Sequence, residues 1–325
     1  MNTQTTTNEP ELSVIVAVIE GGWQATETCL SALEESARGI RLECVLPFDA
    51  RLDQVDKLEA EFPWVNFVDA REHVDVEKFG SKSREHHDIL RAIGLRLATA
   101  PIIALLEDHG TPSKGWCSAL MEAHRRSDAA VIGGAVENGM DRILNWAVYY
   151  CDFGRYQNPV PEHDAEFASD SNVSYKRDAL MSVKEQWYEA FHETSVNWEI
   201  RRRGERLMLD PNMIVHQTRR NLRFVPALNE RYVWGRSFAG TRAAEISGMK
   251  RLVFAALSFV LPFLLTARIL LQGLKKGRFL KELILALPLV FFLQIFWAMG
   301  EFVGYVTGQA EGGDRVNTSA GLEAS

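Results

Sequence analysis

Short apolar runs and amphipathic stretches alternate through the first half of the chain. The apolar runs lie at 13–18, 41–46, 65–68, 102–106 and 130–132, and the amphipathic stretches at 25–36, 53–61, 84–97 and 113–126. The runs have the length of strands, and the stretches between them carry apolar residues at helical spacing. Strands that alternate with helices predict an α/β fold, in which crossover helices flank a mostly parallel sheet.

Polar residues directly follow several of the predicted strands. They are Glu20, Asp49 and the run Glu107-Asp108-His109. In open sheets of this kind, ligands bind beyond the carboxyl ends of the strands. We therefore expect these side chains to face a binding site.

The regular pattern stops between residues 138 and 168, where aromatic residues and prolines become frequent. This composition predicts an irregular segment on the substrate side. Regular structure resumes with a short apolar stretch around Val173 and Tyr175 and a helix that starts at Arg177. A further helix is predicted over 196–203, with Gly204 as its C-terminal cap.

Two hydrophobic segments, 252–267 and 283–300, lie near the C-terminus. Both are shorter than the ~20 residues that span a bilayer, and each contains a proline. The linker between them carries four basic residues, which favour the cytoplasmic side: Lys275, Lys276, Arg278 and Lys281. A spanning hairpin places this linker outside, whereas kinked helices that lie in the inner leaflet keep it inside. Burial of both segments in a soluble domain is the third alternative.

Charge is unevenly distributed along the 325 residues, whose formal net charge is −7. The stretch 216–251 holds eight lysines or arginines against Glu230 and Glu245, which gives it a net charge of +6. A basic stretch beside hydrophobic segments suits the anionic headgroups of a cytoplasmic leaflet. The chain contains no motif that reads bases, so we expect membrane lipids as partners and no nucleic acid.

The cysteines and the N-terminus indicate a compartment. The four cysteines have neither metal-ligand spacing nor the density of a secreted disulfide framework. The first ten residues are polar and lack the basic and apolar parts of a secretory signal. Together these features predict reduced thiols and a cytoplasmic catalytic part.

Six sequence blocks follow one another between about Leu12 and His216. They are SVIV at 13–16, ECVLPFD at 43–49, LRAIG at 90–94, IALLEDH at 103–109, DSNVSYKRDAL at 170–180 and HETSVNWEIRRRG at 192–204. In this order they resemble the motifs of glycosyltransferase family 2, whose members have the GT-A fold. The Gln-x-x-Arg-Trp motif of processive synthases is absent, which implies transfer of one sugar per encounter.

The resemblance implies a membrane-associated bacterial enzyme of the inverting type. It would move a sugar from a nucleotide-sugar donor, UDP-linked by preference, to a membrane-embedded acceptor such as a polyprenyl-linked intermediate or a glycolipid. We expect it in the bacterial inner membrane with a cytoplasmic catalytic domain. The expected division is a flexible N-terminus at 1–11, a GT-A catalytic domain at 12–216, a basic juxtamembrane segment at 217–251, two hydrophobic membrane helices at 252–308 and a disordered tail at 309–325.

The expected metal motif departs from the family pattern. The usual Asp-x-Asp is replaced by Glu107-Asp108-His109, and the family's frame puts Glu107 and His109 at the two acidic positions. The resemblance implies that Asp108 and His109, with Glu107, bind Mn2+ or Mg2+, which would stabilise charge on the leaving diphosphate. The alternative is that Asp108 or Thr111 only caps the following helix.

Donor binding is assigned to five residues: Glu20, Asp49, Arg91, Asp108 and Asn172. Asp49 can accept hydrogen bonds from a uracil imide or a ribose, and Arg91 can reach a base carbonyl or a phosphate. Strand-end exposure of Asp49 and a surface charge at Arg91 are the alternatives. His86, adjacent to His87 on a predicted helix, is expected to be a surface imidazole.

Glu193 is the acid at the family's catalytic-base position, where it would take a proton from an acceptor hydroxyl. Alternatively it only complements the dipole of the helix that follows, and Glu189 is the reserve candidate. An acceptor that is already a phosphate would need no base. His216 either contacts a metal or phosphate or simply ends a strand. The competing function is a non-catalytic membrane protein with a degenerate GT-A domain.

Overall fold

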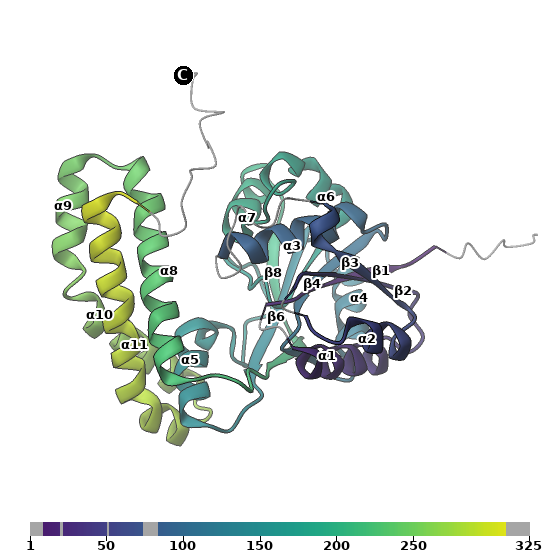
Figure 1. The fold of residues 1–325 in the computed structure, drawn as a ribbon, viewed down its shortest axis with the longest axis horizontal. Helices are drawn as coiled ribbons and strands as arrows, with labels where there is room; N and C mark the ends of the chain where they lie inside the picture. The colour runs from purple at the N-terminus through teal and green to yellow at the C-terminus, as the bar shows by residue number, and fades with distance from the viewer. Residues whose placement is uncertain (1–8, 20–21, 51, 74–83, 310–325) are drawn as a thin grey trace, which may run out of the picture.

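The computed structural model describes residues 9–19, 22–50, 52–73 and 84–309. Within them, one sheet has the strand order β3-β2-β1-β4-β7-β6-β8-β5 (Figure 1). Its strands are β1 Leu12–Ala17, β2 Leu42–Phe48, β3 Val65–Asp69, β4 Ile102–Glu107, β5 Gly110–Pro112, β6 Val131–Asn138, β7 Val173–Lys176 and β8 Leu207–Gln217.

Most neighbouring strands in this sheet are parallel. β1 lies parallel to β2 and β4, β2 to β3, and β6 to β8, whereas β7 runs antiparallel between β4 and β6 and β5 runs antiparallel to β8. Every residue of β1 is buried, because helices cover both faces of this part of the sheet. The predicted α/β fold with a mostly parallel sheet is confirmed.

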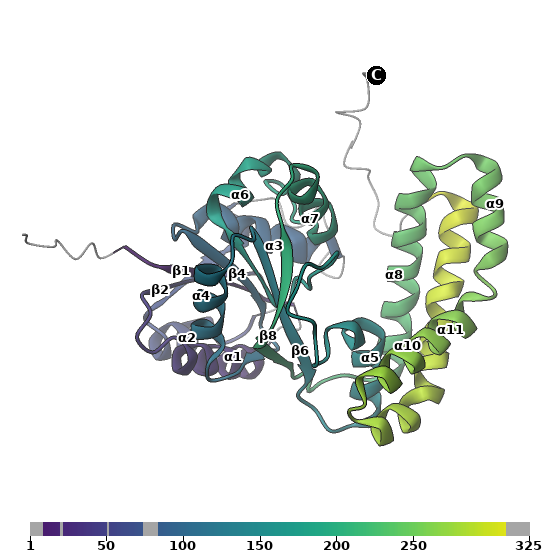
Figure 2. The same ribbon diagram turned by 180° about the vertical axis from the view of Figure 1, so that it is seen from behind.

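Helices flank the sheet on both faces (Figures 1 and 2). The helices α1, α2 and α4 cover one face, and α3, α6 and α7 the other. Their bounds are α1 Trp23–Ser36, α2 Val55–Glu61, α3 Arg84–Leu97, α4 Trp116–Arg126, α6 Arg177–Ser182 and α7 Glu193–Arg202. The first four agree closely with the amphipathic stretches predicted from the sequence.

The segment 138–168 is more regular than predicted, because it contains the helix α5, Ile143–Asp152. Six consecutive residues of α5, from Asn145 to Tyr150, are buried. A helix that is enclosed on nearly every side has no polar face, so its sequence lacks the amphipathic period by which a surface helix is recognised.

Four helices form a C-terminal bundle beside the sheet domain: α8 Phe224–Glu245, α9 Gly248–Leu257, α10 Leu261–Lys276 and α11 Leu280–Thr307. The first hydrophobic segment is divided between α9 and α10, which meet at a bend of 65°. The second lies inside α11, whose 28 residues are long and apolar enough to cross a membrane. If the bent pair counted as one span, the described residues would hold two candidate spans.

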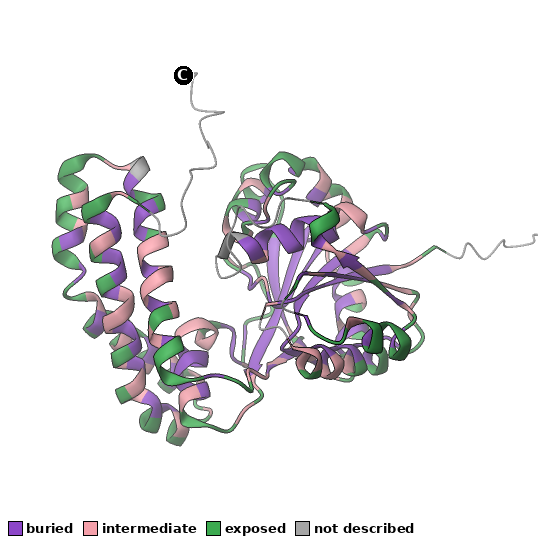
Figure 3. Cartoon of the chain, viewed as in Figure 1, coloured by how far each residue is buried: buried purple, intermediate pink, exposed green. Residues whose placement is uncertain are grey.

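The bundle packs directly on α5 of the sheet domain. Arg231 of α8 forms a buried ion pair with Asp152 of α5. The Tyr150 hydroxyl donates to the Phe279 carbonyl at 3.1 Å, and Gln294 of α11 donates to Cys151 Sγ at 3.4 Å. Side chains of α11 belong to the same buried apolar cluster as the sheet: Leu283, Ala286, Val290 and Leu293. Figure 3 shows buried positions along the bundle helices.

Small residues let α8 and α11 approach closely. A Cβ at Gly300 would overlap the carbonyl oxygen of Tyr232, and a Cβ at Gly235 would overlap the carbonyl oxygen of Trp297. Glycine at these positions therefore allows the two backbones to touch, as small residues do at membrane helix interfaces.

We predict that Gly300→Ala lowers the stability of the bundle by about 1–3 kcal/mol, because backbone atoms cannot move aside as a flexible side chain can. The matched control is Gly248→Ala at the start of α9, where a Cβ would meet nothing within 4 Å. Thermal unfolding of the detergent-solubilised protein measures both. Equal midpoints for the two variants would contradict the close contact of α8 with α11.

Candidate active site

The predicted acidic motif lies at the carboxyl ends of β1 and β4. Glu107 is the last residue of β4, Asp108 and His109 follow it, and all three side chains are buried. The Asp108 carboxylate accepts a hydrogen bond from the Ile19 backbone N–H at 3.0 Å and lies 3.1 Å from His109 Nδ1. These contacts fix the motif to the end of β1, at the edge of the sheet where the sequence predicts a binding site.

Arg91 is the central cation of this cluster. It lies on α3, is 3% exposed, and its guanidinium contacts the carboxylates of Asp88 at 3.2 Å, Glu107 at 2.8 Å and Asp170 at 3.1 Å. Burial acts to lower the pKa of Arg91, but the surrounding carboxylates, Asp170 foremost, raise it above its ordinary value. Arg91 is therefore a permanent positive charge that compensates several acids at once.

Glu107 faces polar groups on both carboxylate oxygens. Oε1 accepts the bond from Arg91, while Oε2 accepts a bond from Gln217 Nε2 at 3.2 Å and lies 3.4 Å from His109 Nε2. Burial raises the pKa of Glu107, and the charges of His109 and Arg91 only partly oppose this. For His109, burial acts to lower the pKa, but the hydrogen bond to the Asp108 carboxylate and the charge of Glu107 raise it overall.

The same cluster holds the helix that begins with Glu193. Asp88 Oδ2 lies 2.9 Å from Nδ1 of His192, which directly precedes α7. Glu193 is half-buried, and its Oε1 accepts a hydrogen bond from Asn197 at 3.4 Å. The charge of Glu193 also contributes to the raised pKa of Arg91. Arg91, Glu107 and Glu193, separated by up to 102 positions in the sequence, thus lie in one electrostatic cluster.

Asp49 follows β2 and is paired with His86. Asp49 Oδ2 lies 2.6 Å from His86 Nε2, and the two residues are 4% and 1% exposed. The prediction of a surface imidazole at His86 is wrong. A buried carboxylate needs a polar partner, and α3 brings His86 to the end of β2 to supply one.

The other predicted residues lie apart from the Arg91 cluster. Asn172 is fully buried, accepts a hydrogen bond from Trp116 Nε1 at 2.8 Å and donates to backbone carbonyls of β6 and β8 at 2.8 Å. These bonds fix the start of β7 against its neighbours. His216 lies on β8, with Nε2 3.3 Å from Ser113 Oγ. Glu20 lies outside the described residues.

Four cluster residues were not predicted from the sequence: Asp88, Asp170, His192 and Gln217. Asp88 stands three positions before Arg91 on a helix, a spacing at which opposite charges meet. Asp170 opens one of the recognised blocks. His192 likewise opens a recognised block, whereas for Gln217 the sequence contains no local signal, because its partner lies on a distant element.

Arg219 also lies near the motif, and the sequence alone does not predict this position. It follows β8, its side chain is 25% exposed, and it forms an ion pair with Glu230 of α8 at 3.2 Å. Its positive charge acts to lower the pKa of His109. Arg219 is therefore close enough to contribute positive potential at the motif, while its partner lies on the bundle.

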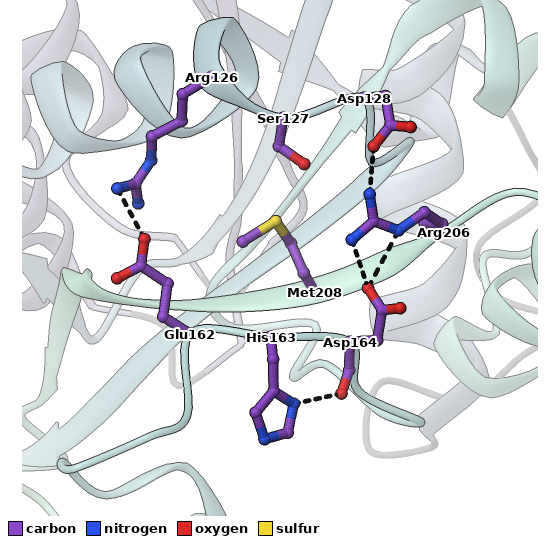
Figure 4. A pocket seen from close by; sticks show the side chains of 8 residues that line it. All are labelled: Arg126, Ser127, Asp128, Glu162, His163, Asp164, Arg206 and Met208. Atoms are coloured by element: carbon purple, nitrogen blue, oxygen red, sulfur yellow. Dashed lines mark hydrogen bonds and ion pairs between the residues drawn. The ribbon is translucent and has the colours of Figure 1, made fainter.

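A separate cavity of about 640 Å³ lies at the opposite edge of the sheet, where β6 and β8 begin (Figure 4). Ion pairs cross it, with Arg126 2.6 Å from Glu162 and Arg206 2.8 Å from Asp164. These exposed pairs hold the segment before Asp170 against the sheet. The cavity contains none of the predicted site residues.

The residues of the predicted metal motif are engaged by other protein groups. No group of three or more His, Cys, Asp or Glu residues in the described part of the chain is arranged to hold one. Glu107 is engaged by Arg91 and Gln217, and one Asp108 oxygen is engaged by Ile19 and His109. Arg91 supplies the positive charge that a metal would otherwise provide to Glu107.

Comparison with known proteins identifies glycosyltransferases. No protein-family model matches the chain. A glucosyl-dolichyl phosphate glucuronosyltransferase of Haloferax volcanii is 24% identical over 154 residues, which are 44% of this chain and 45% of that protein. The match thus spans less than half the length of this curated relative.

Two solved structures are similar to this chain. A mannosyltransferase of Pyrobaculum calidifontis in complex with GDP-Man and Mn2+ has a TM-score of 0.52 at 14% identity, covering 92% of this chain and 87% of that chain. The S. aureus TarS 1–349 structure has a TM-score of 0.46 at 11% identity, covering 70% and 64%. The first of these likenesses confirms the expected GT-A-type fold.

We predict that Arg91→Ala destabilises the protein by about 3–5 kcal/mol at neutral pH, because it leaves buried carboxylates uncompensated. The pKa of Glu107 is already raised, and loss of Arg91 raises it further. An acid whose pKa is raised in the folded state destabilises that state when it is ionised and not when it is protonated. The stability lost by Arg91→Ala relative to the wild type should therefore shrink as the pH falls from 8 towards 5. Urea unfolding at both pH values measures this.

Arg96→Ala is the control, since Arg96 lies on the same helix and stacks on Tyr188 outside the cluster. It should have a small effect that does not depend on pH. If both variants lose the same stability at both pH values, Arg91 is not the group that compensates the buried carboxylates.

Proposed function

We propose that this protein is a glycosyltransferase that moves one sugar from a nucleotide-sugar donor, UDP-linked, to a lipid-linked acceptor with inversion at the anomeric carbon. The observation that carries the proposal is the convergence of Arg91, Glu107 and Glu193 at the carboxyl edge of a GT-A-type sheet. The names of the H. volcanii relative and the P. calidifontis neighbour support the same reaction class.

Donor binding is proposed for the strand ends on both sides of β1. Asp49, held by His86, is placed to accept hydrogen bonds from the base or ribose. Arg91 and Arg219 are the cations nearest to the motif and would attract the diphosphate. This set keeps Asp49 and Arg91 in the roles expected from the sequence, and Arg219 comes from the basic stretch 216–251, whose arginines the sequence also offers for a pyrophosphate or a lipid phosphate.

Glu193 is the proposed catalytic base. Its carboxylate would take the proton of the acceptor hydroxyl as that oxygen bonds to the anomeric carbon. The bond from the anomeric carbon to the donor oxygen breaks, and its electron pair leaves with the nucleoside diphosphate. Half-burial leaves Glu193 open to an acceptor, whereas the fully buried Asp108 is enclosed.

A membrane location belongs to the same proposal. The apolar α11 and the basic stretch 216–251 favour membrane association, with the catalytic domain on the cytoplasmic side of a bacterial inner membrane. A lipid-linked acceptor would then meet the site without leaving the bilayer, which raises its local concentration.

The second candidate is a membrane protein that binds nucleotide sugars without transferring them. It is favoured by the engagement of Glu107, Asp108 and His109 with other protein groups. Donor hydrolysis distinguishes the two functions, because a binding protein would release no sugar from UDP-glucose, UDP-glucuronic acid or GDP-mannose.

We predict that Glu193→Gln lowers kcat by at least about a hundredfold, the usual contribution of a positioned base. Nucleotide affinity should be unchanged, since the donor phosphates contact other groups. Glu189→Gln is the matched control, because Glu189 is exposed and was the reserve candidate. Full activity of the Glu193 variant would show either another base or an acceptor that is already a phosphate.

A divalent metal is the remaining part of the proposal. Five carboxylates surround the site: Asp88, Glu107, Asp108, Asp170 and Glu193. The positive groups near them are Arg91, Arg219 and the neighbouring imidazoles. A diphosphate would meet this negative charge, so we predict that Mn2+ or Mg2+ tightens UDP binding at least about tenfold relative to chelator. Calorimetry in detergent measures the difference, and equal affinity would assign charge compensation to the arginines alone.

A further inference from the structure

The C-terminal bundle has an unusually apolar outer surface. Of the 25 exposed large hydrophobic residues in the described chain, 18 lie between 248 and 307. Phe259 is 70% exposed, Leu271 66% and Phe263 64%. The outward sides of α9, α10 and α11 contain many exposed positions (Figure 3). A contiguous apolar surface of this kind marks an interaction site.

Charge on the same helices identifies the partner. Residues 248–307 contain seven lysines or arginines and two glutamates, a net charge of +5. One of the glutamates, Glu301, is buried inside the bundle. Cations that frame an apolar surface fit the headgroups and acyl chains of an anionic bilayer.

The longest helix of the bundle is not free to cross that bilayer. Just before α11 begins, the Phe279 carbonyl accepts a hydrogen bond from Tyr150 of the sheet domain. In the middle of α11, Gln294 donates a hydrogen bond to Cys151 of the sheet domain. Only the 13 residues 295–307 extend beyond this contact. At 1.5 Å per residue they cover about 20 Å, whereas the hydrocarbon core is about 30 Å thick.

The arrangement of the bundle beside the sheet domain also argues against a helix that crosses the bilayer. The bundle and the sheet domain lie side by side and extend over the same height in both views (Figures 1 and 2). A bilayer perpendicular to the bundle would therefore have to enclose polar surface of the sheet domain as well. A bilayer parallel to the bundle axis avoids this conflict.

The bent pair α9 and α10, which holds the first hydrophobic segment, also fits a parallel arrangement. The bend of 65° between α9 and α10 exposes Phe259 and Val260 at its apex. Arg268, exposed on α10, would lie inside the hydrocarbon if the pair crossed the membrane, at a cost of about 3 kcal/mol near the centre. Parallel to the surface, its long side chain reaches the headgroups.

The turn between α10 and α11 faces the sheet domain. Arg278 lies 2.6 Å from Glu137 at the end of β6, and Lys276 donates to the Pro159 carbonyl at 3.2 Å. The basic linker therefore stays on the side of the catalytic domain. The helix α8 makes this possible, because it carries the chain to the far end of the bundle before α9 and α10 return.

We propose that α9, α10 and α11 bind one leaflet of an anionic bilayer parallel to its surface and do not cross it. This inference rests on the membrane association within the proposed function and is independent of sugar transfer. Both ends of α11 then lie on the same side of the membrane as the catalytic domain.

Labelling of introduced cysteines tests the topology. Gln309→Cys, just beyond α11, Lys275→Cys, before the turn between α10 and α11, and Glu59→Cys, on α2, are all at exposed positions. The native Cys29, Cys44 and Cys117 are buried, and the wild type gives the background from the half-buried Cys151. A membrane-impermeant maleimide is applied to inverted and to right-side-out vesicles from a bacterial expression host. All three introduced cysteines should react only in inverted vesicles. Reaction of Gln309→Cys from the opposite side to Glu59→Cys would show a single span, and reaction of Lys275→Cys from that side would show a spanning hairpin; either result would overturn the proposal.

Vesicle binding tests the surface. Phe259→Glu combined with Phe263→Glu should weaken binding to phosphatidylcholine vesicles that contain phosphatidylglycerol by at least about tenfold. Phe167→Glu, at an exposed aromatic residue of the sheet domain, should bind like the wild type. Unchanged binding of the double variant would overturn the assigned face. UDP binding in detergent is measured in parallel, so loss of the proposed function is distinguished from loss of membrane contact.

Discussion

Compensation of buried charge is the constraint on which the site depends. Arg91, Asp88 and Glu107 are nearly inaccessible to water, and an uncompensated charge in such a place is strongly destabilising. The partners come from separate parts of the chain: Asp88 from α3 itself, Glu107 from the end of β4 and Asp170 from the segment before β7. The charge network can form only when these elements are in place, so folding and assembly of the site are one event.

The bundle is part of the same folded unit and not an attached anchor. Apolar side chains of α11 continue the core of the sheet domain, and the Arg231–Asp152 pair is buried between them. This double role explains the composition of α11. One side of the helix packs on α5 and α8, while residues such as Phe292 on the other side remain exposed. Hydropathy alone reports the sum of both faces and therefore does not distinguish a spanning helix from one that packs along the protein.

Local patterns in the sequence predict the first half of the fold well, since each strand and helix there has the period of its own type. The prediction of helices fails where burial on all sides removes the apolar period, as in α5. It also fails where opposite sides of a helix pack on different neighbours, as in α8. For the site, the resemblance selects Asp49, Arg91, Glu107 and Glu193, and the structure brings the last three into one cluster. The Asp88–His192 contact and the buried state of His86 depend on tertiary packing, which no local pattern contains.

One segment connects the C-terminal bundle with the Arg91 cluster. The backbone carbonyls of Asn158 and Pro159 accept hydrogen bonds from Arg278 and Lys276 at the turn between α10 and α11. A few residues later the chain is held against β8 by Asp164, and it then reaches Asp170, which contacts Arg91. Because Glu137 binds both Arg278 and the Asn158 backbone N–H, this segment cannot move at its start without loss of a buried carboxylate's partners. The position of Asp170, and with it the charge balance at Arg91, is therefore set partly by the docking of the bundle, which gives the bundle a structural role in the site besides the proposed contact with lipid.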